Sequence, residues 1–382
     1  MSHHRHIQHH LTPVLFAIVL FVVAYIVLVE VPQIFKKKTD TEDHTRVVET
    51  KPLSPTPEAK ENPLVSVWQE VTPPVVWEPR DSQSVAVFKD ALWLTGGLNA
   101  NGKVDKNGVV EYWNAPYFND IWKTEDGSTW TKVVEHAPWG HRRSMGFEAV
   151  GDKLVAFMGW DQDRQEYPPD IWTSKDGVNW TQSIRYAPWT SREGQQTVIH
   201  NGKLWFLGGV NYAKRSMFND VWNTPDGITW DLVKGQAPWS ERWDHAVVSF
   251  KGKIYVLGGM ELGGKTFNDV WSSVDGKDWV EVTAHAPWTS RQGHLAFVSD
   301  GKLFLVGGIN DHDIKIHDIW YTEDGEKWVR VPTPTPWIGR EDFAGAVFKD
   351  TYYVMGGMGD DRVWRNDIWM LVPKVPTTPE AK

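Results

Sequence analysis

The sequence predicts an all-β protein that folds as a six-bladed β-propeller, and three observations predict this fold class. A unit recurs six times, every 49–50 residues apart from a longer first copy. Each unit holds four strand-like segments. The fourth segment of the sixth unit is missing at the C-terminal end and is found before the first unit. Radial repetition of four-stranded units is typical of propellers, and this permutation closes a ring by joining the two chain ends.

The repeat is defined by residues at fixed spacing. A Trp, most often in Ala-Pro-Trp, opens each copy: Trp77, Trp139, Trp189, Trp239, Trp288 and Trp337. Three residues later every copy has an Arg: Arg80, Arg142, Arg192, Arg242, Arg291 and Arg340. Seventeen residues beyond each Arg stands a Gly: Gly97, Gly159, Gly209, Gly259, Gly308 and Gly357. Such strict repetition favours an architectural role for these positions.

Two more tryptophans in each repeat explain most of the 24 Trp among 382 residues. One lies in Asn-Asp-(Ile/Val)-Trp, and the other follows it by eight residues, after Asp-Gly. The sixth copy of the latter is absent after Trp369, whereas Trp68 precedes Trp77 by nine residues, the spacing from Trp130 to Trp139. Eighteen tryptophans therefore fall on repeat positions, and we expect them to pack between blades.

The four strands of a repeat are readable in residues 245–283. HAVVSF (245–250) and IYVLGG (254–259) are the first and second strands, joined by a Lys-Gly-Lys turn. NDVWSS (268–273) and DWVEVT (278–283) are the third and fourth, and Asp275-Gly276 between them is a strong hairpin signal. Because successive strands alternate in direction, the Arg, the Gly pair and the loop between strands two and three share one face, here called the Arg face. The Asp-Gly hairpins lie on the other face.

These motifs resemble the kelch repeats of the galactose oxidase-like superfamily, with an Arg opening the first strand, Gly-Gly closing the second and a Trp starting the fourth. The resemblance covers about residues 65–371, and copy two departs from it with Met158-Gly159. It implies a six-bladed propeller whose first strand is innermost. The Ser/Thr-x-Asp-Gly-x-x-Trp hairpins, such as Ser174 to Trp180, are similar to the Asp-box turns of sialidases but are one residue shorter.

Four segments outside the predicted propeller (65–373) have other expected roles. Residues 1–10 are a His-rich tail, and residues 11–31 hold a 19-residue uncharged run that is long enough for a transmembrane anchor. We favour an uncleaved anchor over a signal peptide, because small residues at a cleavage site are lacking. Residues 32–64 are a disordered linker, and 374–382 a C-terminal tail. By the positive-inside rule, Lys36–Lys38 would place the propeller in the cytoplasm. A short tail before a single anchor instead favours export of the domain that follows it. We therefore expect a single-pass membrane protein with an extracytoplasmic propeller.

Composition excludes several classes of site. The chain has no Cys, which excludes disulfides and Cys-ligated zinc or iron–sulfur centres. The net charge of −9 argues against nucleic acid as a partner. We expect neither a cofactor nor a bound metal.

The candidate ligand-binding residues lie on the Arg face. The loop between strands two and three is a dozen residues longer in copy one and carries Trp113, and insertions in repeat proteins often map to the binding face. Arg side chains bind carboxylates or phosphates with a planar fork, so the six repeated arginines are candidates for an anion site. Residues that differ between repeats complete the candidate set: Trp160, Glu193, Tyr212, Trp243, His245 and His294.

We weigh three functions. The leading one is a membrane-tethered, non-catalytic module that binds a protein or glycan ligand on the Arg face, since no catalytic signature is found. The alternative is an acidic-sugar enzyme, such as a sialic-acid mutarotase-like epimerase, which the kelch and sialidase resemblances imply. Whether the chain is an enzyme is thus open, with a non-enzyme favoured. A copper radical oxidase, also implied by the resemblance, needs a Cys that this chain lacks.

Overall fold

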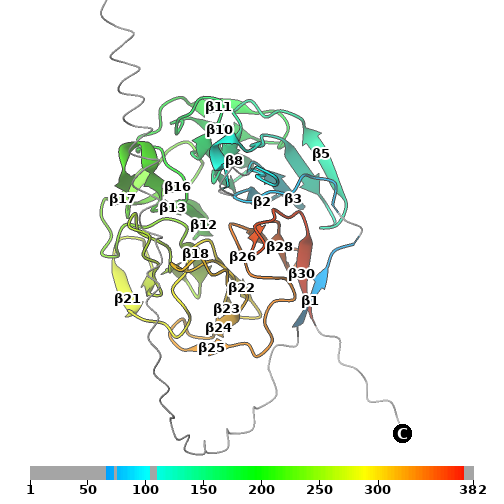
Figure 1. Ribbon diagram of the computed structural model, residues 1–382. Coiled ribbons are helices and arrows are strands. Elements are labelled where there is room, and N and C mark those ends of the chain that lie inside the picture. Colours follow the sequence, from blue (N-terminus) through cyan, green and yellow to red (C-terminus); the bar gives the residue numbers. More distant parts are fainter. Residues whose placement is uncertain (1–65, 73–74, 104–109, 374–382) are drawn as a thin grey trace, which may run out of the picture. The chain divides into compact units, whose positions relative to one another are not determined.

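The computed structural model describes residues 66–72, 75–103 and 110–373, and these form a β-propeller (Figure 1). The predicted tail (1–10), anchor (11–31), linker (32–64) and C-terminal tail (374–382) lie outside the described residues. Within the described ranges no helix is long and apolar enough to span a bilayer. Their helical structure consists of two 3-10 turns, η2 (Tyr112–Asn114) and η3 (Tyr212–Lys214).

Six four-stranded antiparallel sheets are the blades of the propeller, which confirms the predicted fold class. Blade 1 consists of β2 (Ser84–Phe88), β3 (Ala91–Thr95), β4 (Ile121–Thr124) and β5 (Trp130–Val134). Blade 2 consists of β7 (Gly146–Val150), β8 (Lys153–Phe157), β10 (Ile171–Ser174) and β11 (Thr181–Ile184). Blade 3 consists of β12 (Gln196–His200), β13 (Lys203–Leu207), β16 (Val221–Thr224) and β17 (Asp231–Lys234). Blade 4 consists of β18 (Ala246–Phe250), β19 (Lys253–Leu257), β20 (Val270–Ser273) and β21 (Trp279–Thr283). Blade 5 consists of β22 (Leu295–Ser299), β23 (Lys302–Val306), β24 (Ile319–Thr322) and β25 (Trp328–Arg330). Blade 6 consists of β27 (Ala344–Phe348), β28 (Thr351–Met355), β30 (Ile368–Pro373) and β1 (Ser66–Glu70).

The sixth blade joins the two ends of the propeller, as the permuted repeat predicts. The outer strand β1 pairs antiparallel with β30, and Trp68 lies opposite Leu371. The blue β1 and the red β30 therefore lie side by side in Figure 1. Separation of the ring at this blade would require the β1–β30 ladder to break, so the N-terminal strand holds the ring closed.

The first strand of each blade is innermost, and consecutive inner strands contact one another around the whole ring: β2, β7, β12, β18, β22 and β27. A ring of six backbone hydrogen bonds connects the blades at the Arg face. In each, the N–H of the second Gly of one blade donates to the carbonyl of the repeated Arg of the next, as in Gly308 to Arg340 at 2.9 Å and Gly357 to Arg80 at 2.9 Å. Gly308 has φ of +93°, and a Cβ there would lie 2.6 Å from the carbonyl oxygen of Gln292, so both its conformation and its surroundings require glycine.

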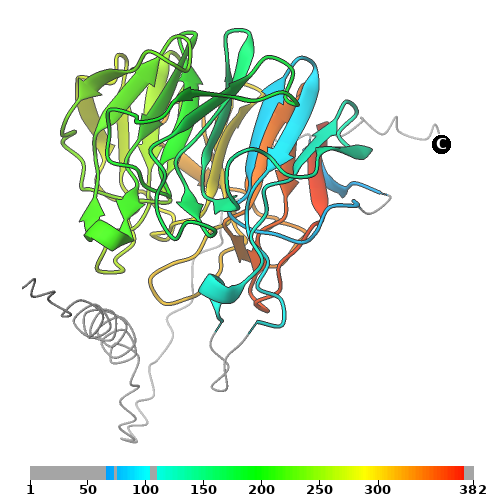
Figure 2. The ribbon, with the colours of Figure 1, turned by 90° about the horizontal axis from the view of Figure 1, so that it is seen from above.

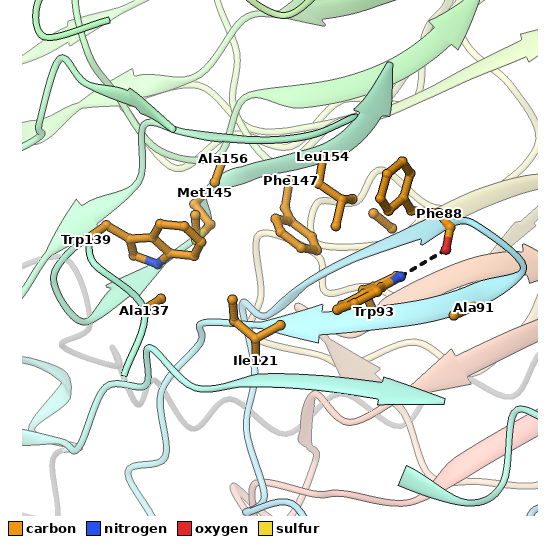
Figure 3. Close-up of a cluster of buried hydrophobic side chains, with 11 residues drawn as sticks. Phe88, Ala91, Trp93, Ile121, Ala137, Trp139, Met145, Phe147, Leu154 and Ala156 are labelled. Carbon is orange, nitrogen blue, oxygen red and sulfur yellow. Dashed lines mark hydrogen bonds between the residues drawn. The ribbon is translucent and has the colours of Figure 1, made fainter. Parts of the chain in front are cut away.

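Apolar side chains fill the space between adjacent blades. Figure 3 shows one such cluster, in which Phe88 and Trp93 of blade 1 face Phe147 and Leu154 of blade 2. The indole N–H of Trp93 donates to the Phe88 carbonyl at 3.0 Å, which satisfies its polar group inside the core. Burial of each side chain of this size contributes about 1.5–3 kcal/mol, so the inter-blade clusters stabilise the ring.

The tryptophans of the repeat pack in pairs, which confirms their expected structural role. In every blade the first Trp meets the fourth-strand Trp edge to face, with centroids 4.7–6.3 Å apart: Trp77–Trp130, Trp139–Trp180, Trp189–Trp230, Trp239–Trp279, Trp288–Trp328 and Trp337–Trp68. This geometry is favoured by the aromatic quadrupole. The third-strand Trp has another partner, described below.

Three short two-stranded ladders lie on the Arg face: β6 (Arg142–Arg143) with β9 (Trp160–Asp161), β14 (Val210–Asn211) with β15 (Ser216–Met217), and β26 (Arg340–Glu341) with β29 (Met358–Gly359). They belong to the loops that extend beyond the blades. Figure 2, turned by 90°, shows these loops on one side of the sheets. The candidate site is built from them.

Candidate functional site

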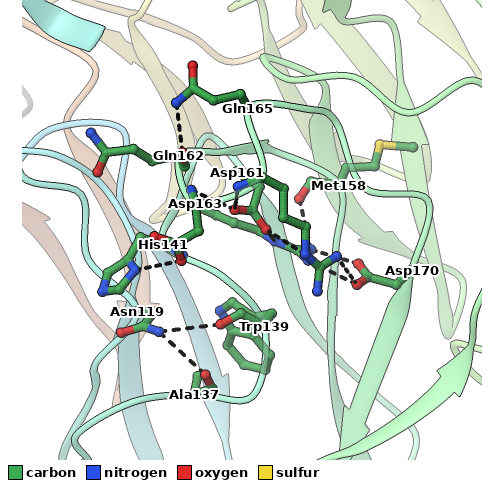
Figure 4. A network of polar contacts seen from close by, with 12 residues as sticks. Asn119, Ala137, Trp139, His141, Met158, Asp161, Gln162, Asp163, Gln165 and Asp170 are labelled. Atoms are coloured by element: carbon green, nitrogen blue, oxygen red, sulfur yellow. Dashed lines mark hydrogen bonds and ion pairs between the residues drawn. The ribbon is translucent and has the colours of Figure 1, made fainter. Parts of the chain in front are cut away.

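The six repeated arginines lie inside the blades. The Arg291 guanidinium donates to both carboxylate oxygens of Asp318, at 2.7 and 3.2 Å, and to the Gly307 carbonyl at 2.9 Å. The same fork occurs in every blade: Arg80–Asp120, Arg142–Asp170, Arg192–Asp220, Arg242–Asp269, Arg291–Asp318 and Arg340–Asp367. Figure 4 shows the pair of blade 2 at Asp170, with the Met158 carbonyl beside it. We call these twelve residues the Arg–Asp layer.

The contacts of this layer leave the arginine side chains almost no solvent-accessible surface. Their exposed fractions are 0–1%. The guanidiniums also stack on rings, as Arg192 does on Phe218 at 3.5 Å and Arg291 on Trp288 at 5.8 Å. Bidentate pairing and stacking are the strongest contacts that a guanidinium makes. The structure therefore places the six predicted ligand-binding arginines beneath the Arg face, already paired, instead of at its opening.

The aspartates of the layer have a second partner. The third-strand Trp lies two residues after each Asp, and in five blades its indole N–H donates to that carboxylate, as Trp320 does to Asp318 at 2.8 Å. Burial raises the pKa of Asp318, but the hydrogen bonds and charge of Arg291 outweigh it, and the pKa is lowered. In every blade the layer thus joins a guanidinium and a carboxylate by two hydrogen bonds.

The opening of the central channel is formed by the two residues that follow each repeated Arg, which we call the mouth. The second of these has positive φ in all six blades: Ser82, Ser144, Gly194, Asp244, Gly293 and Asp342. Backbone hydrogen bonds connect these residues from blade to blade, as in Asp244 to Gly194 at 2.9 Å and Asp342 to Gly293 at 3.1 Å. They line one end of a cavity of about 550 Å³ that follows the inner strands. The mouth is therefore a ring of backbone segments to which every blade contributes a different pair of residues.

The first residue after each Arg is fixed by a short pairing with the residue after the Gly pair, such as Glu193 with Val210 and Trp243 with Met260. These first residues vary between copies, and only Glu occurs twice: Asp81, Arg143, Glu193, Trp243, Gln292 and Glu341. Together with Asp244, Asp342 and the nearby Lys315, the mouth holds five carboxylates against two cations. Its charge is thus negative when all these groups are ionised.

Two of the five carboxylates have internal partners. Arg143 binds Glu193 through Nε at 2.9 Å and Nη2 at 3.2 Å, and the Tyr167 hydroxyl donates to Glu193 at 3.0 Å. The Lys315 ammonium lies 3.3 Å from Glu341. Glu193, a predicted binding residue, therefore holds Arg143 and Tyr167 in place at the mouth.

The other three carboxylates, Asp81, Asp244 and Asp342, have no ion-pair partner among the described residues. Within the described part of the chain, neither Asp244 nor Asp342 makes a side-chain hydrogen bond or an ion pair, and Oδ1 of Asp81 is buried without a hydrogen-bond partner. Burial, reinforced by Asp342, raises the pKa of Asp81 and of Asp244 well above the ordinary value. Burial also raises the pKa of Asp342, with Arg143 and Lys315 opposing the shift. Asp342 is therefore close enough to repel both Asp81 and Asp244 when it is charged.

The insertion of copy one packs beside the mouth. Its Tyr117 joins Trp160, Tyr167 and Trp364 in a buried cluster contributed by blades 1, 2 and 6. Trp160, a predicted contact residue, is 8% exposed and meets Tyr167 edge to face at 4.9 Å. Tyr117 and the partly buried Tyr112 therefore pack against the loops around the mouth. The side chain of Trp113 lies outside what the structure describes.

Tyr212 and Trp243 form an aromatic rim on the side of blades 3 and 4. Their rings meet edge to face at 5.6 Å, and Tyr212 is 37% exposed. The charges of Glu193 and Asp244 add to burial in raising the pKa of Tyr212. These two predicted residues lie beside the carboxylates of the mouth and keep accessible surface.

His245 and His294 lie deeper, between the blades. The ring of His294 would contact a Cβ placed on Gly258 of the preceding blade, and the ring of His245 one placed on Gly208. Burial and Arg291 lower the pKa of His294 to about 3, and burial and Arg242 lower that of His245. Both are therefore neutral spacers that occupy the position held by Met145 in blade 2 and Phe343 in blade 6.

Several residues of the mouth were missed by the sequence-based set: Asp81, Arg143, Asp244, Lys315, Glu341 and Asp342. All but Lys315 lie one or two residues after the repeated Arg, at positions that vary between copies. This variation already indicates Asp244, Glu341 and Asp342 as polar residues of the Arg face, although the candidate set leaves them out. Among the described residues no group of three or more His, Asp or Glu side chains has a geometry that would hold a metal ion.

Comparisons with known proteins support the fold. Residues 224–377 match the family model described as the KLHDC2/KLHL20/DRC7 Kelch-repeats domain. The solved structure titled "Structure of YjhT" is similar with a TM-score of 0.61 and 17% identity, over 78% of this chain and 95% of that one. No curated protein sequence matches the chain. Because 491 chains of solved structures match the fold, the architecture by itself does not select a function.

Proposed function

We propose that this kelch-repeat β-propeller is a non-catalytic binding module, tethered to a membrane by residues 11–31, that holds a protein or glycan ligand at the mouth. The observation that carries the proposal is the contrast in pairing on the Arg face. Every buried charge of the Arg–Asp layer has its partner, whereas Asp244 and Asp342 line the cavity without one. Unpaired polar groups in a concave, rigid site are typical of a place where a ligand supplies the missing partners.

The proposal that the module is non-catalytic rests on the surroundings of the side chains that would transfer protons in an enzyme. Glu193 is held by Arg143 and Tyr167, and His245 and His294 are buried between blades with lowered pKa values. A general acid or base needs access to its substrate and a pKa near the working pH. Glu193 is already engaged by Arg143 and Tyr167, and the lowered pKa values of His245 and His294 disfavour proton uptake by either ring.

The second candidate function is the acidic-sugar enzyme, and one observation favours it. Arg143 is a guanidinium at the mouth outside the six repeated pairs, and a sugar carboxylate is a suitable ligand for it. The carboxylates that outnumber Arg143 and Lys315 count against this candidate, because they repel an anion.

Ligand-observed NMR on the full-length protein tests the choice. We expect Asp244→Asn combined with Asp342→Asn to abolish binding of whichever ligand uses the mouth. Mutarotation of sialic acid by the unmodified protein that is lost in Arg143→Gln would instead establish the enzyme. If neither mouth variant changes the binding of any ligand tested, the proposed location is wrong.

The tether is tested separately, on intact cells that express the full chain. Protease added outside should release the propeller by cutting the linker 32–64. Cleavage that occurs only after lysis would contradict an extracytoplasmic propeller.

A further inference from the structure

We propose that the mouth binds a lysine or arginine side chain presented by a partner protein, and that Asp81, Asp244 and Asp342 hold its cation. This inference rests on the binding function proposed above and names the chemistry of the ligand.

The first support is the charge balance. Arg143 forms an ion pair with Glu193 at 2.9 Å, and Lys315 forms one with Glu341 at 3.3 Å. Of the three aspartates that remain, Asp244 and Asp342 line the cavity, and the buried Asp81 lies close enough to Asp342 for their charges to interact. Among the described residues no cation lies within ion-pair distance of any of the three. Like charges in a partly buried site are stabilised by a cation placed among them, and destabilised by an anion.

The second support is independent of the acidic groups. Tyr117 is 4% exposed, and within the described residues its hydroxyl has no hydrogen-bond partner. The ring lies 5.8 Å from the Arg143 guanidinium, and the charges of Arg143, Glu193 and Asp81 all act on the hydroxyl. A buried, unbonded hydroxyl costs free energy unless a ligand group reaches it. The Tyr117 hydroxyl can accept a hydrogen bond from a guanidinium or ammonium that enters between the aspartates.

The shape of the site favours a side chain of a protein over a metal ion. Among the described residues no set of three ligands is arranged for a metal. The opening leads into a cavity of about 550 Å³, which admits a long side chain but not a folded element. Tyr212 and Trp243 stand at its edge, and aromatic faces attract the cations and the stems of Arg and Lys.

The negative sign of the charge at the mouth also affects the rate at which a partner associates. A negative opening attracts a basic partner before contact, so association should be fast at low salt and slower as salt is added. Arginine is among the residues that dominate binding energy at protein interfaces. One inserted Arg with a polar surround would therefore give the interface its specificity.

The test uses fluorescence anisotropy with full-length protein in detergent and three capped, labelled heptapeptides, Gly-Ser-Gly-X-Gly-Ser-Gly, in which X is Arg, Gln or Glu. We expect the Arg peptide to bind at least about tenfold more tightly than the Gln peptide, and the Glu peptide to bind least. Free arginine amide, added as a competitor, distinguishes a small amine ligand: it should displace the peptide only at far higher concentration.

Paired variants locate the site. Asp244→Asn with Asp342→Asn should weaken the Arg peptide about tenfold or more, whereas Asp231→Asn, an exposed carboxylate on the outer strand β17, should leave its affinity unchanged. Thermal melting of both proteins checks that they are folded.

Three outcomes overturn the inference. Equal affinity for the Arg and Gln peptides, or no Arg-peptide binding up to about 1 mM, removes the cation as the recognised group. The Glu peptide or sialic acid could instead bind more tightly than the Arg peptide and lose this binding in the double variant or in Arg143→Gln. That result would overturn a basic partner as the ligand, but it would still locate a binding site at the mouth. Displacement of the peptide by equimolar arginine amide identifies a small amine instead of a partner protein.

Discussion

Arg291 and Asp342 both bring a charge to the Arg face, but their surroundings differ. Arg291 belongs to the Arg–Asp layer, where each guanidinium meets a carboxylate of its own blade at 2.5–2.8 Å. Asp342 belongs to the mouth, where carboxylates outnumber cations and Asp342 has no described partner. The arginine and aspartate that recur in all six repeats pair with each other in every blade, whereas Asp244 and Asp342, at a position that varies between repeats, have no ion-pair partner among the described residues. The difference separates the residues that build the ring from those available to a ligand.

The largest expected effect comes from breaking the layer. Arg291→Ala leaves the buried Asp318 without its cation, so we expect a loss of about 3–5 kcal/mol of unfolding free energy in urea denaturation. Arg185→Ala, at an exposed position, is the matched control and should cost less than about 0.5 kcal/mol. Equal losses in the two variants would show that the layer does not stabilise the ring.

A slightly smaller effect is expected at the inter-blade ring of hydrogen bonds. Gly308→Ala forces a side chain into a backbone with φ of +93° and onto the Gln292 carbonyl, at an expected cost of about 2–3 kcal/mol. Gly301→Ala has a similar positive φ, but nothing lies within 4 Å of its new Cβ. Its cost in the same denaturation experiment should be about 1 kcal/mol. If both substitutions cost the same, the close approach of the blades contributes nothing.

Glu148 extends the comparison into the channel. It lines the cavity on β7, accepts a hydrogen bond from Thr197 at 2.9 Å, and burial raises its pKa to about 7. The folded state therefore favours the protonated acid, so its contribution lowers stability as pH rises from about 4.5 to about 7. Glu148→Gln keeps the acceptor and removes the charge. We expect it to gain about 1–3 kcal/mol at pH 8 and nothing at pH 4, measured by denaturation at both pH values. A gain independent of pH would contradict this origin.

The Asp-Gly hairpins should show the smallest effect. Asp226 accepts from the backbone N–H groups of Ile228 and Thr229, at 2.8 and 2.7 Å, and these bonds help to lower its pKa against the effect of burial. Asp226→Ala should cost about 1 kcal/mol at pH 7. Because the folded-state pKa is depressed, the contribution of Asp226 is present above its unfolded pKa and is lost as pH falls, so the variant and the parent protein should converge in acid. Persistence of the full difference at pH 2 would rule out the carboxylate as its source.

The repeats made much of the fold predictable. The spacing from Trp68 to Trp77 predicted the closing strand, and β1 pairs with β30 as expected. The shared spacing of Arg and Gly predicted that they lie on one face, where a hydrogen bond joins Arg291 to Gly307. These features depend on residues that recur six times, so each copy supports the interpretation of the others.

The candidate site was less predictable, for a physical reason. The direction of Asp81 or Arg143 depends on the next residue adopting positive φ, and non-glycine residues such as Ser82 and Ser144 give little sign of this in sequence. His245 and Phe343 hold equivalent positions and have opposite polarity, yet both pack against a glycine of the preceding blade. A position can therefore vary in a repeat because it fills space differently, without being available to a ligand.

The central claim is that the unpaired mouth carboxylates, Asp244 and Asp342, are not needed for folding, whereas the Arg–Asp layer is. The most direct test is urea denaturation of Asp342→Asn at pH 7.5 beside Arg291→Ala. Asn tolerates positive φ and removes a repelled charge, so we expect the unfolding free energy of Asp342→Asn to equal or exceed that of the parent protein. A loss in Asp342→Asn as large as that in Arg291→Ala would contradict the claim, because it would make Asp342 part of the scaffold.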